Sequence, residues 1–419
     1  MNLLNNPEKR KWMIVVTIFI AIICNYLDRQ LLSILKPTIK AAFDMNDDGY
    51  AFIVNIFLIC YAVMYPISGI LVDRFGPKKV MFLGILAWSA ACIGGGLSTN
   101  MEQFAFFRGL LGLAEPTIVA VTVWFEKRQR ATANSLCTAG GSIGTVVAPI
   151  VIAWLSTIFP WNDVFVLAGA IGILIAIVWM AVYADPPKEI LDVTLSESAA
   201  NRHHGKAFTW GGLWKTRTLW GVLLIRFVSD PVWYFCLFWL PGYLQEDSGL
   251  TLIQVGWVGW IPFLFGAVGG VLTSAWSDKM VRRGMDPLRA RKRMMTLVAV
   301  AAPLCIFTPY FNALPPYWNV AAIIASFSLI AIMCLSWLYT ICVVIAEAFP
   351  VRNVASVVGI TAGFGAVGGA IFNYYVGQLL STMGPSLFLV MGILHWIAVV
   401  ILWKMTRPEI PQEKQAVQK

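Results

Sequence analysis

The chain has 419 residues, of which 58% are hydrophobic and only 13% are charged. Soluble globular proteins contain about 25% charged residues, so this composition excludes an ordinary water-soluble fold. Apolar runs long enough to cross a hydrocarbon layer of about 30 Å recur along the chain. They predict a protein that crosses a lipid bilayer many times.

The basic charge is distributed unevenly. A net charge of +9 could suggest a nucleic-acid partner, but the distribution argues against one. Of the 31 Lys and Arg residues, 26 fall on one side of the predicted membrane layer, Lys36 and Lys40 fall on the other, and Arg29, Arg108 and Arg226 fall inside apolar runs. The positive-inside rule therefore places both termini in the cytoplasm. We expect a multi-pass protein of the inner (cytoplasmic) membrane.

The eight cysteines all lie in apolar runs and form no CxxC pair. His203 and His204 lie in a polar stretch, and His395 is alone in the last apolar run. These patterns predict neither a disulfide framework nor a metal site, and we expect no cofactor.

Twelve helical spans can be drawn along the chain. They begin near residues 12, 51, 80, 102, 133 and 163, and then near 219, 252, 293, 317, 355 and 386. The first is read as a retained helix, since no small-residue cleavage site follows it. The predicted fold is all-α and integral to the membrane, with two pseudo-symmetric six-helix bundles, residues 1–184 and 218–419. The longest polar stretch, 185–217, is the expected cytoplasmic linker between them.

The two halves share an internal repeat. Phe125, Arg128, Ala131, Gly141 and Gly144 in the first half are matched, 224 residues later, by the same residue types in the second. Five matches at one offset suggest an ancient duplication. Parallel repeats of six spans, with a binding site at their interface near mid-membrane, are typical of one class of secondary transporter.

The second and third spans are joined by a glycine-rich basic motif. Residues 69–79 read Gly-Ile-Leu-Val-Asp-Arg-Phe-Gly-Pro-Lys-Lys, which closely resembles the major facilitator superfamily signature GxxxD(R/K)xGx(R/K)(R/K). A degraded copy lies at 274–279. We expect the motif to gate movement of the two halves rather than to bind solute, through Gly69, Asp73, Arg74, Gly76 and Lys78.

Span 1 contains the adjacent charges Asp28 and Arg29. Charged groups inside a membrane are costly and are functional candidates by default. Adjacent residues of a helix point about 100° apart. One of the two can therefore face the packed interior of a half while the other faces a central cavity. The alternative is that they neutralise each other.

Span 4 carries Arg108, Gly112 and Glu115 at spacings that place them on one helix face. Gly112 leaves room for a neighbouring helix or a solute. A carboxylate near mid-membrane favours its neutral form, which suits reversible protonation, so Glu115 and Asp28 are the predicted proton-coupling residues. A structural salt bridge from Glu115 to Arg108 or Arg29 is the alternative.

The second half offers further polar and aromatic groups. Arg226 and Asp230 in span 7 can neutralise each other. Trp233 and Tyr234 can face lipid or line the cavity with Tyr61. Trp337 and Asn373 can pack or donate hydrogen bonds to a hydroxylated solute, as can Tyr339 and Thr340.

A family resemblance rests on three segments. Asn-Tyr-Leu-Asp-Arg-Gln at 25–30, the span 4 pattern at 108–115, and Trp-Phe-x-x-x-x-Arg-Ala at 124–131 look like the anion:cation symporter family of the major facilitator superfamily, which includes bacterial hexuronate and galactonate transporters. The resemblance implies proton-coupled uptake of small organic anions. It implies that Arg29 contacts the substrate carboxylate with Tyr61 beside it, and that Asp28 and Glu115 are protonated.

The resulting hypothesis is a monomeric proton symporter for a sugar acid such as a hexuronate or aldonate. The predicted substrate-binding residues are Arg29, Tyr61, Arg108, Trp233, Tyr234, Trp337 and Asn373. An antiporter or exporter of another solute is an alternative, although arginines inside the spans argue against a cationic drug. Transport of phosphate or a dicarboxylate, and a transporter-like sensor, are further alternatives. No HExxH, GxSxG or P-loop spacing supports an enzyme.

Overall fold

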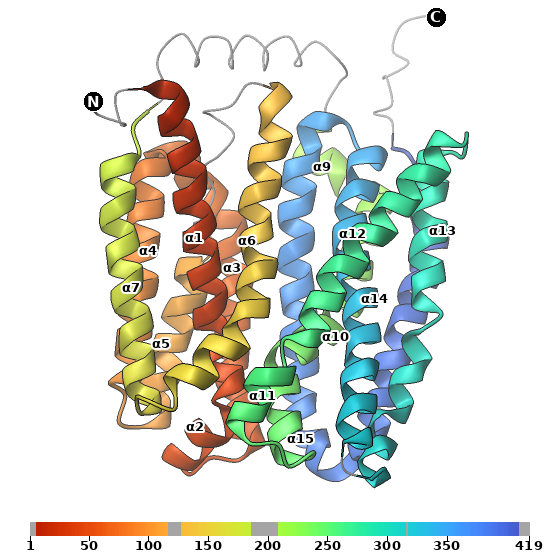
Figure 1. Ribbon diagram of the computed structural model, residues 1–419. Coiled ribbons are helices and arrows are strands. Elements are labelled where there is room, and N and C mark those ends of the chain that lie inside the picture. Colours follow the sequence, from red (N-terminus) through yellow and green to blue (C-terminus); the bar gives the residue numbers. More distant parts are fainter. Residues whose placement is uncertain (1–5, 116–126, 186–207, 316, 410–419) are drawn as a thin grey trace, which may run out of the picture.

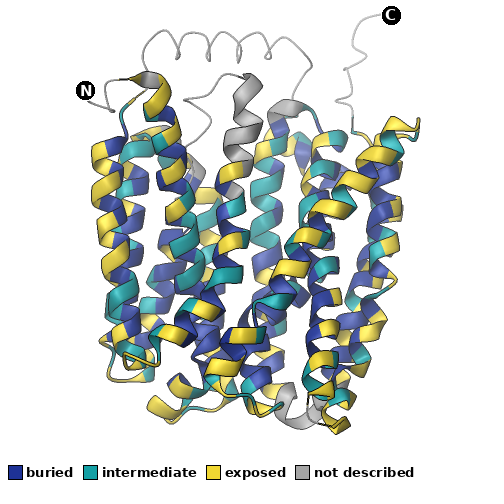
Figure 2. Cartoon of the chain, in the orientation of Figure 1, coloured by how far each residue is buried: buried dark blue, intermediate teal, exposed yellow. Residues whose placement is uncertain are grey.

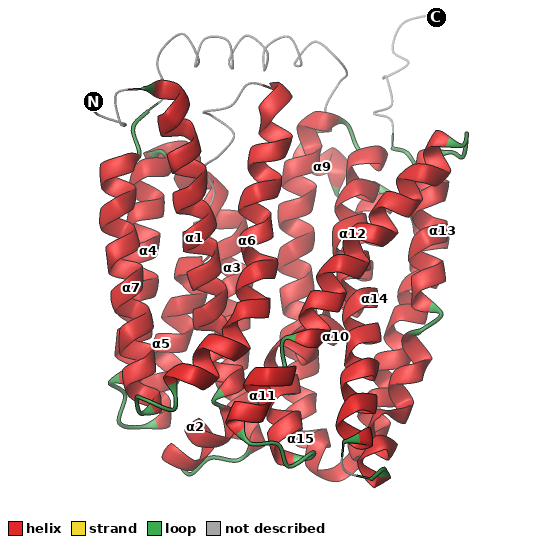
Figure 3. Ribbon diagram, in the orientation of Figure 1, coloured by secondary structure: helices red, strands yellow, loops and turns green. Residues whose placement is uncertain are grey.

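The computed structural model describes residues 6–115, 127–185, 208–315 and 317–409. Inside these ranges, the side chains at 7, 69, 73, 127–135, 138, 351–352 and 379–385 are not described. The described chain is helical and its helices run roughly side by side (Figures 1 and 3).

The first half forms one group of helices. They are α1 (Pro7–Ile34), α2 (Lys36–Ala42), α3 (Asp47–Phe75), α4 (Pro77–Gly96), α5 (Met101–Ala114), α6 (Lys127–Leu155) and α7 (Trp161–Val182). Within this group α1 packs on α6, α3 on α5, and α4 on α7.

The second half forms the group beside it (Figure 1). It contains α9 (Trp210–Leu213), α10 (Arg217–Glu246), α11 (Leu252–Val258), α12 (Ile261–Arg282), α13 (Pro287–Ala299), the 3-10 helix η3 (Ala302–Ala313), α14 (Trp318–Ala348) and α15 (Val351–Met405). Here α10 packs on α15, and α12 on α14.

Local sequence explains where several helices begin. The side chains of Asn6, Asn46, Asn100 and Thr216 each accept a hydrogen bond from a backbone N–H in the first turn of α1, α3, α5 and α10. Such caps satisfy backbone donors that have no partner inside the helix. Thr251 and Gln254 form a reciprocal capping box at the start of α11.

The helical surface suits a bilayer. Among the described residues, ten helical segments are long and apolar enough to cross a membrane, and α15 contains two of them, Asn353–Gln378 and Ser386–Met405. Residues on the outside of the bundle are exposed (Figure 2), and large apolar residues are among them, such as Leu174 and Ile177 on α7. The two predicted spans that are not among the ten begin near 102 and 133, and each lies partly outside the described side chains. The all-α membrane fold expected from the sequence is confirmed.

Repeated glycines bring helices together in the same way in both halves. A Cβ at Gly144 would lie 2.9 Å from the carbonyl oxygen of Ile23 on α1, and one at Gly368 would lie 2.1 Å from the carbonyl oxygen of Phe227 on α10. Lipid tails are as apolar as leucine, so helices in a membrane gain little from burying apolar area and depend on close packing between small residues. The repeated glycines therefore serve the α1–α6 and α10–α15 contacts.

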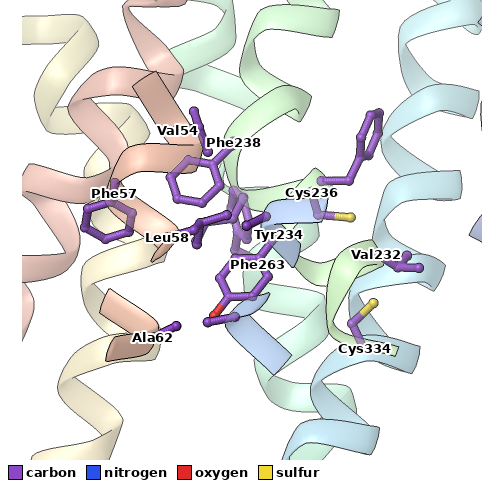
Figure 4. Packing of buried hydrophobic residues seen from close by; sticks show 14 of the residues in the cluster. Val54, Phe57, Leu58, Ala62, Val232, Tyr234, Cys236, Phe238, Phe263 and Cys334 are labelled. Atoms are coloured by element: carbon purple, nitrogen blue, oxygen red, sulfur yellow. The ribbon is translucent and has the colours of Figure 1, made fainter. Parts of the chain in front are cut away.

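The two groups meet along α1, α2, α3 and α6 on one side and α10, α11, α12 and α15 on the other. We call the face where α1 begins and α15 ends the terminal face, and the opposite face, where α2 lies and α10 ends, the distal face (Figure 1). An apolar seam joins the groups, with Val54, Phe57 and Leu58 of α3 facing Tyr234 and Phe238 of α10 (Figure 4).

Candidate functional site

The buried cation Arg29 forms an ion pair with Glu115. A guanidinium nitrogen of Arg29, on α1, donates to the Glu115 carboxylate at the end of α5. The Arg29 and Glu115 side chains are only 8% and 1% exposed. A charge at this depth needs a partner, because an uncompensated buried charge costs several kcal/mol. The structure therefore places together the predicted anion-binding residue and one of the two predicted proton-coupling residues.

Aromatic rings surround the Arg29 guanidinium. Its central carbon lies 5.1 Å from the ring centroids of Tyr26 and Tyr61 and 5.4 Å from that of Phe57. Aromatic faces attract cations, more strongly where water is excluded. Tyr61 also stacks on Phe57 with centroids 5.8 Å apart. The rings stabilise the cation without consuming its hydrogen-bond donors.

Two polar atoms of this pair, Arg29 Nε and Glu115 Oε1, make no regular hydrogen bond among the described residues, although the Asn25 amide lies close to the Glu115 carboxylate. Buried polar atoms are usually satisfied, so an orphaned donor and acceptor side by side mark a place where a further polar group can bind. The Arg29 guanidinium thus keeps one donor, Nε, that no described residue uses.

Asp28 faces a different environment from Arg29. The indole N–H of Trp88 on α4 donates to its carboxylate, and Arg108 on α5 donates to its backbone oxygen at 3.3 Å. The central carbon of the Arg108 guanidinium lies 5.1 Å from the ring centroid of Phe104 and 4.6 Å from that of Phe165. Asp28 thus lies inside the first helical group. Arg108 lies with it and away from the Arg29 rings.

A cavity of about 110 Å³ lies between the two groups. Tyr26, Ser142 and Thr145 line it from the first group, and Trp233 and Tyr339 from the second. The Ser142 and Tyr339 hydroxyls are 3.2 Å apart across it. The Tyr26 ring both contacts Arg29 and lines this cavity, so the guanidinium lies one ring away from it.

Other predicted site residues lie elsewhere. Arg226 and Asp230 pair with each other at 2.8 Å, as the helical spacing allowed. Tyr234 stacks on Phe238 at the seam between the groups. Trp337 lies inside the second group, where its indole donates to the Met295 oxygen at 3.0 Å.

Asn373 of α15 joins the two groups. Its Nδ2 donates to the Ala51 oxygen at 3.0 Å and to Asn55 Oδ1 at 2.9 Å, both on α3. Its Oδ1 accepts from the Trp239 indole at 2.6 Å. The structure therefore places this predicted substrate contact in the closed interface between the groups.

The glycine-rich motif forms the junction between α3 and α4. Gly76 has φ 80° and ψ 153°, and nothing lies within 4 Å of a Cβ built on it. That backbone region is accessible essentially to glycine alone, so conformation rather than space requires the residue. Arg74 is exposed, and the Lys78 backbone oxygen accepts from the Trp179 indole. The surroundings of Gly69 and the side chain of Asp73 lie outside the described part of the structure.

Two charged clusters were not predicted as such. At the distal face Lys36 and Lys40 contact both Asp47 and Glu246. At the terminal face Arg291 joins Asp278, in the degraded motif copy, to Glu347. A signal for the first cluster was in the sequence: its lysines are the two that break the positive-inside pattern.

Comparisons with known proteins agree with this architecture. The sequence profile of the Major Facilitator Superfamily matches residues 18–343. A probable L-galactonate transporter of Escherichia coli strain K12 is 30% identical over 292 residues, which cover 66% of this chain and 64% of that protein. The hexuronate transporter of the same strain is 24% identical over 413 residues, covering 94% and 93% of the two chains.

A crystal structure of a D-xylose–proton symporter superposes with a TM-score of 0.76 at 12% identity, covering 95% of this chain and 98% of that one. At this identity the likeness shows the fold alone. The profile, however, matches well over half of the chain, and the helices, the glycine-rich junction and the paired helical groups agree with it. The chain is a multi-pass membrane protein that belongs to the major facilitator superfamily, a family of transporters.

Proposed function

We propose that this protein is a proton-coupled symporter that takes up a small organic anion, namely a sugar acid such as a hexuronate or aldonate. The observation that carries the proposal is the buried Arg29–Glu115 pair, with its unused donor and acceptor. A second support is that relatives over most of the chain are named as transporters of hexuronate and D-galactonate.

In the proposed mechanism, Glu115 and the substrate carboxylate compete for Arg29. Without substrate, the ionised Glu115 compensates the guanidinium. A proton on Glu115 removes that compensation and leaves the Arg29 fork for the carboxylate, which it can bind through two parallel hydrogen bonds. The unloaded pair and the protonated, loaded site are both neutral overall.

Charge balance is what couples the two fluxes. A site holding substrate with Glu115 ionised would carry one uncompensated negative charge. Burying that charge as the halves rock would cost several kcal/mol. Substrate therefore crosses only together with a proton. Asp28, on the neighbouring helix face, is the proposed second protonation site.

The cavity supplies groups for the rest of the solute. Trp233 offers an apolar ring face, and Ser142 and Tyr339 offer hydroxyls. These suit the alternating C–H and O–H surface of a sugar acid. We include Tyr61 and Tyr234 as walls of the path. Arg108 is proposed to position Asp28, and Trp337 to pack the second group.

We further propose that the terminal face is cytoplasmic, as the basic loops indicate, and that residues 1–184 and 218–419 are the rocking bundles joined by 185–217. Among the described residues, the ion pairs that join the two groups, Lys36–Glu246 and Lys40–Glu246, lie at the distal face. The structure is then the form closed to the outside.

The test is uptake of labelled D-galacturonate and D-galactonate by proteoliposomes that contain the purified protein. With an acidic outside and a neutral inside, we expect accumulation that collapses when a protonophore is added. Uptake that is indifferent to the imposed gradient would rule out symport.

Arg29→Lys tests the carboxylate role in the same assay. Lysine keeps the charge but loses the planar fork, and a hydrogen bond to a charged group contributes about 1.5–3 kcal/mol. We expect KM to rise roughly 10- to 100-fold. Arg217→Lys, at an exposed residue where α10 begins, is the matched control. Unchanged KM in Arg29→Lys would contradict the assignment.

A further inference from the structure

The distal face is closed by four charged side chains. Lys36 Nζ lies 2.9 Å from Asp47 Oδ1 and 2.6 Å from Glu246 Oε2. Lys40 Nζ lies 2.8 Å from Asp47 Oδ1 and 3.0 Å from Glu246 Oε1. The two lysines and Asp47 belong to the first helical group, and Glu246 ends α10 in the second. The cluster is neutral overall while the groups are in contact.

The Lys36 side chain is enclosed by packed residues and does not lie at the surface. It is 0% exposed. Its Nζ lies 5.3 Å from the Tyr50 ring centroid and 4.5 Å from that of Trp239. A Cβ at Gly242 would lie 2.5 Å from Lys36 Cδ, so α10 approaches the lysine stem very closely. The ammonium group is thus held in place by packing.

The geometry around Glu246 is that of carboxylate recognition. Each of its two oxygens meets a different ammonium group, Oε2 with Lys36 and Oε1 with Lys40. Both cations lie on one helical group, whereas the carboxylate arrives from the other. A simple latch needs one ion pair, but two ammonium groups on one carboxylate form a receptor that a free carboxylate can also fill.

Opening the distal face changes the charge of this receptor. Glu246 leaves with the second group, while Lys36, Lys40 and Asp47 remain together with one net positive charge. The other described acids of this face on the first group are exposed, namely Asp44, Asp48, Glu102 and Asp163, and exposed charge pairs interact weakly. The rim of the open path therefore presents a cationic site to the outside.

We propose that Lys36 and Lys40 form an anion-capture site at the distal entrance, which Glu246 fills while this face is closed and the carboxylate of the incoming solute fills when it opens. The site rests on the proposed function in one respect, namely that the solute is an anion. It lies apart from Arg29, so the solute would bind first at the lysines and then at the guanidinium. When the solute carboxylate leaves the lysines for Arg29, the Glu246 carboxylate can return to them, which would favour closure of the distal face behind the solute.

Two neutralising variants separate capture from a mere latch. Lys40→Gln removes a receptor cation, and Glu246→Gln removes the competitor but keeps both lysines. We expect Lys40→Gln to raise KM for galacturonate about threefold to tenfold and to flatten the dependence of uptake on salt, because charges at a rim act mainly on the association rate. Glu246→Gln should not raise KM. Lys215→Gln, an exposed lysine of the terminal face, makes the same charge change and should leave KM unaltered.

If the lysines only latch the face, both variants lose the Lys40–Glu246 pair between the groups and should shift KM and maximal rate in the same direction. That parallel behaviour would overturn the proposal.

A measurement that needs no transport completes the test. In Glu246→Gln, the rates at which a water-soluble N-hydroxysuccinimide ester acylates Lys36 and Lys40 are followed by mass spectrometry, with D-galacturonate as the probe anion. We expect the probe to slow acylation at these lysines and not at Lys215. Uptake by the wild type without protection would overturn capture alone. Protection without uptake would overturn the symporter proposal alone. If D-galacturonate neither protects the lysines nor is taken up, both proposals are overturned.

Discussion

Asp28 and Arg29 are neighbours in the chain, yet they contact different parts of the molecule. Asp28 accepts from Trp88 inside the first group, while Arg29 pairs with Glu115 between aromatic rings. The helical twist of about 100° per residue produces this separation. A change of protonation at either carboxylate therefore acts on the same helix, α1, from two sides.

At the residue scale, Glu115→Gln should uncouple the fluxes. The amide resembles the protonated acid in shape and charge, so Arg29 stays available to substrate at every pH. We expect exchange of internal for external substrate to persist. The roughly tenfold accumulation that one proton supports across a one-unit pH gradient should be lost. Counterflow and gradient-driven uptake measure the two quantities separately.

Glu102→Gln is the control for this prediction, since Glu102 is exposed in the first turn of the same helix. It should retain both activities. Gradient-driven accumulation that survives in Glu115→Gln would move the coupling proton to another group, with Asp28 the next to test.

The charged residues of this site could be predicted from the sequence, but their partners could not. The polar segment 25–30 and the i, i+7 spacing in span 4 indicated Asp28, Arg29 and Glu115, because charges in apolar runs are rare. The partners of each charge could not be predicted, since pairing depends on helix contacts far apart in sequence. Trp88, Phe57 and Tyr26 are ordinary apolar-run residues until the fold places them beside a charge.

At the scale of elements, the helices pack through glycines that the sequence marks only as small residues. A Cβ at Gly112 on α5 would lie 2.4 Å from the Phe57 oxygen on α3 and 3.1 Å from Cys60 Cβ. The glycine thus serves a neighbouring helix, which was one of its two expected uses. Hydropathy predicted the positions of most helices, but the spans predicted near 355 and 386 form the single 55-residue helix α15, and the short helix α2 and the 3-10 segment η3 were not predicted.

Gly112→Ala should destabilise the protein by about 1–3 kcal/mol, because the methyl group forces α5 away from backbone that cannot yield. Thermal unfolding in detergent, followed by intrinsic fluorescence, measures the change. Gly359→Ala on α15 is the matched control, since nothing lies within 4 Å of its Cβ, and it should be neutral or slightly stabilising. Equal melting temperatures for the two variants would show that α3 and α5 can separate at no cost.

At the scale of the whole molecule, the two helical groups are held together by apolar packing and by ion pairs. The apolar seam of α3 and α10 joins them by packing (Figure 4), and the lysine cluster joins them by ion pairs at the distal face. The division into two halves was predicted from the repeat and the loop charges. The proposed closure of the distal face was not predicted, because a sequence that alternates between two forms must support both of them.

Asn373 gives the sharpest test of that closure. Its bond to Trp239 lies within the second group and is kept in either state, whereas its bonds to Ala51 and Asn55 cross between the groups. Asn373→Leu therefore removes two hydrogen bonds from the closed distal form alone. A buried polar group left without its partner costs about 1–3 kcal/mol, so the population with an open distal face should rise roughly 5- to 150-fold.

Distances between spin labels at Ala42 and Ile253, in a background without the native cysteines, measure this population. Asn312→Leu is the control, because Asn312 bonds to the Tyr243 hydroxyl entirely within the second group. If Asn373 instead contacts substrate, as its place in an apolar span first suggested, the variant will raise KM and leave the distance distribution unchanged. A shift toward longer distances with little change in KM identifies it as part of the closure, because only a bond that exists in one state can bias the equilibrium between two.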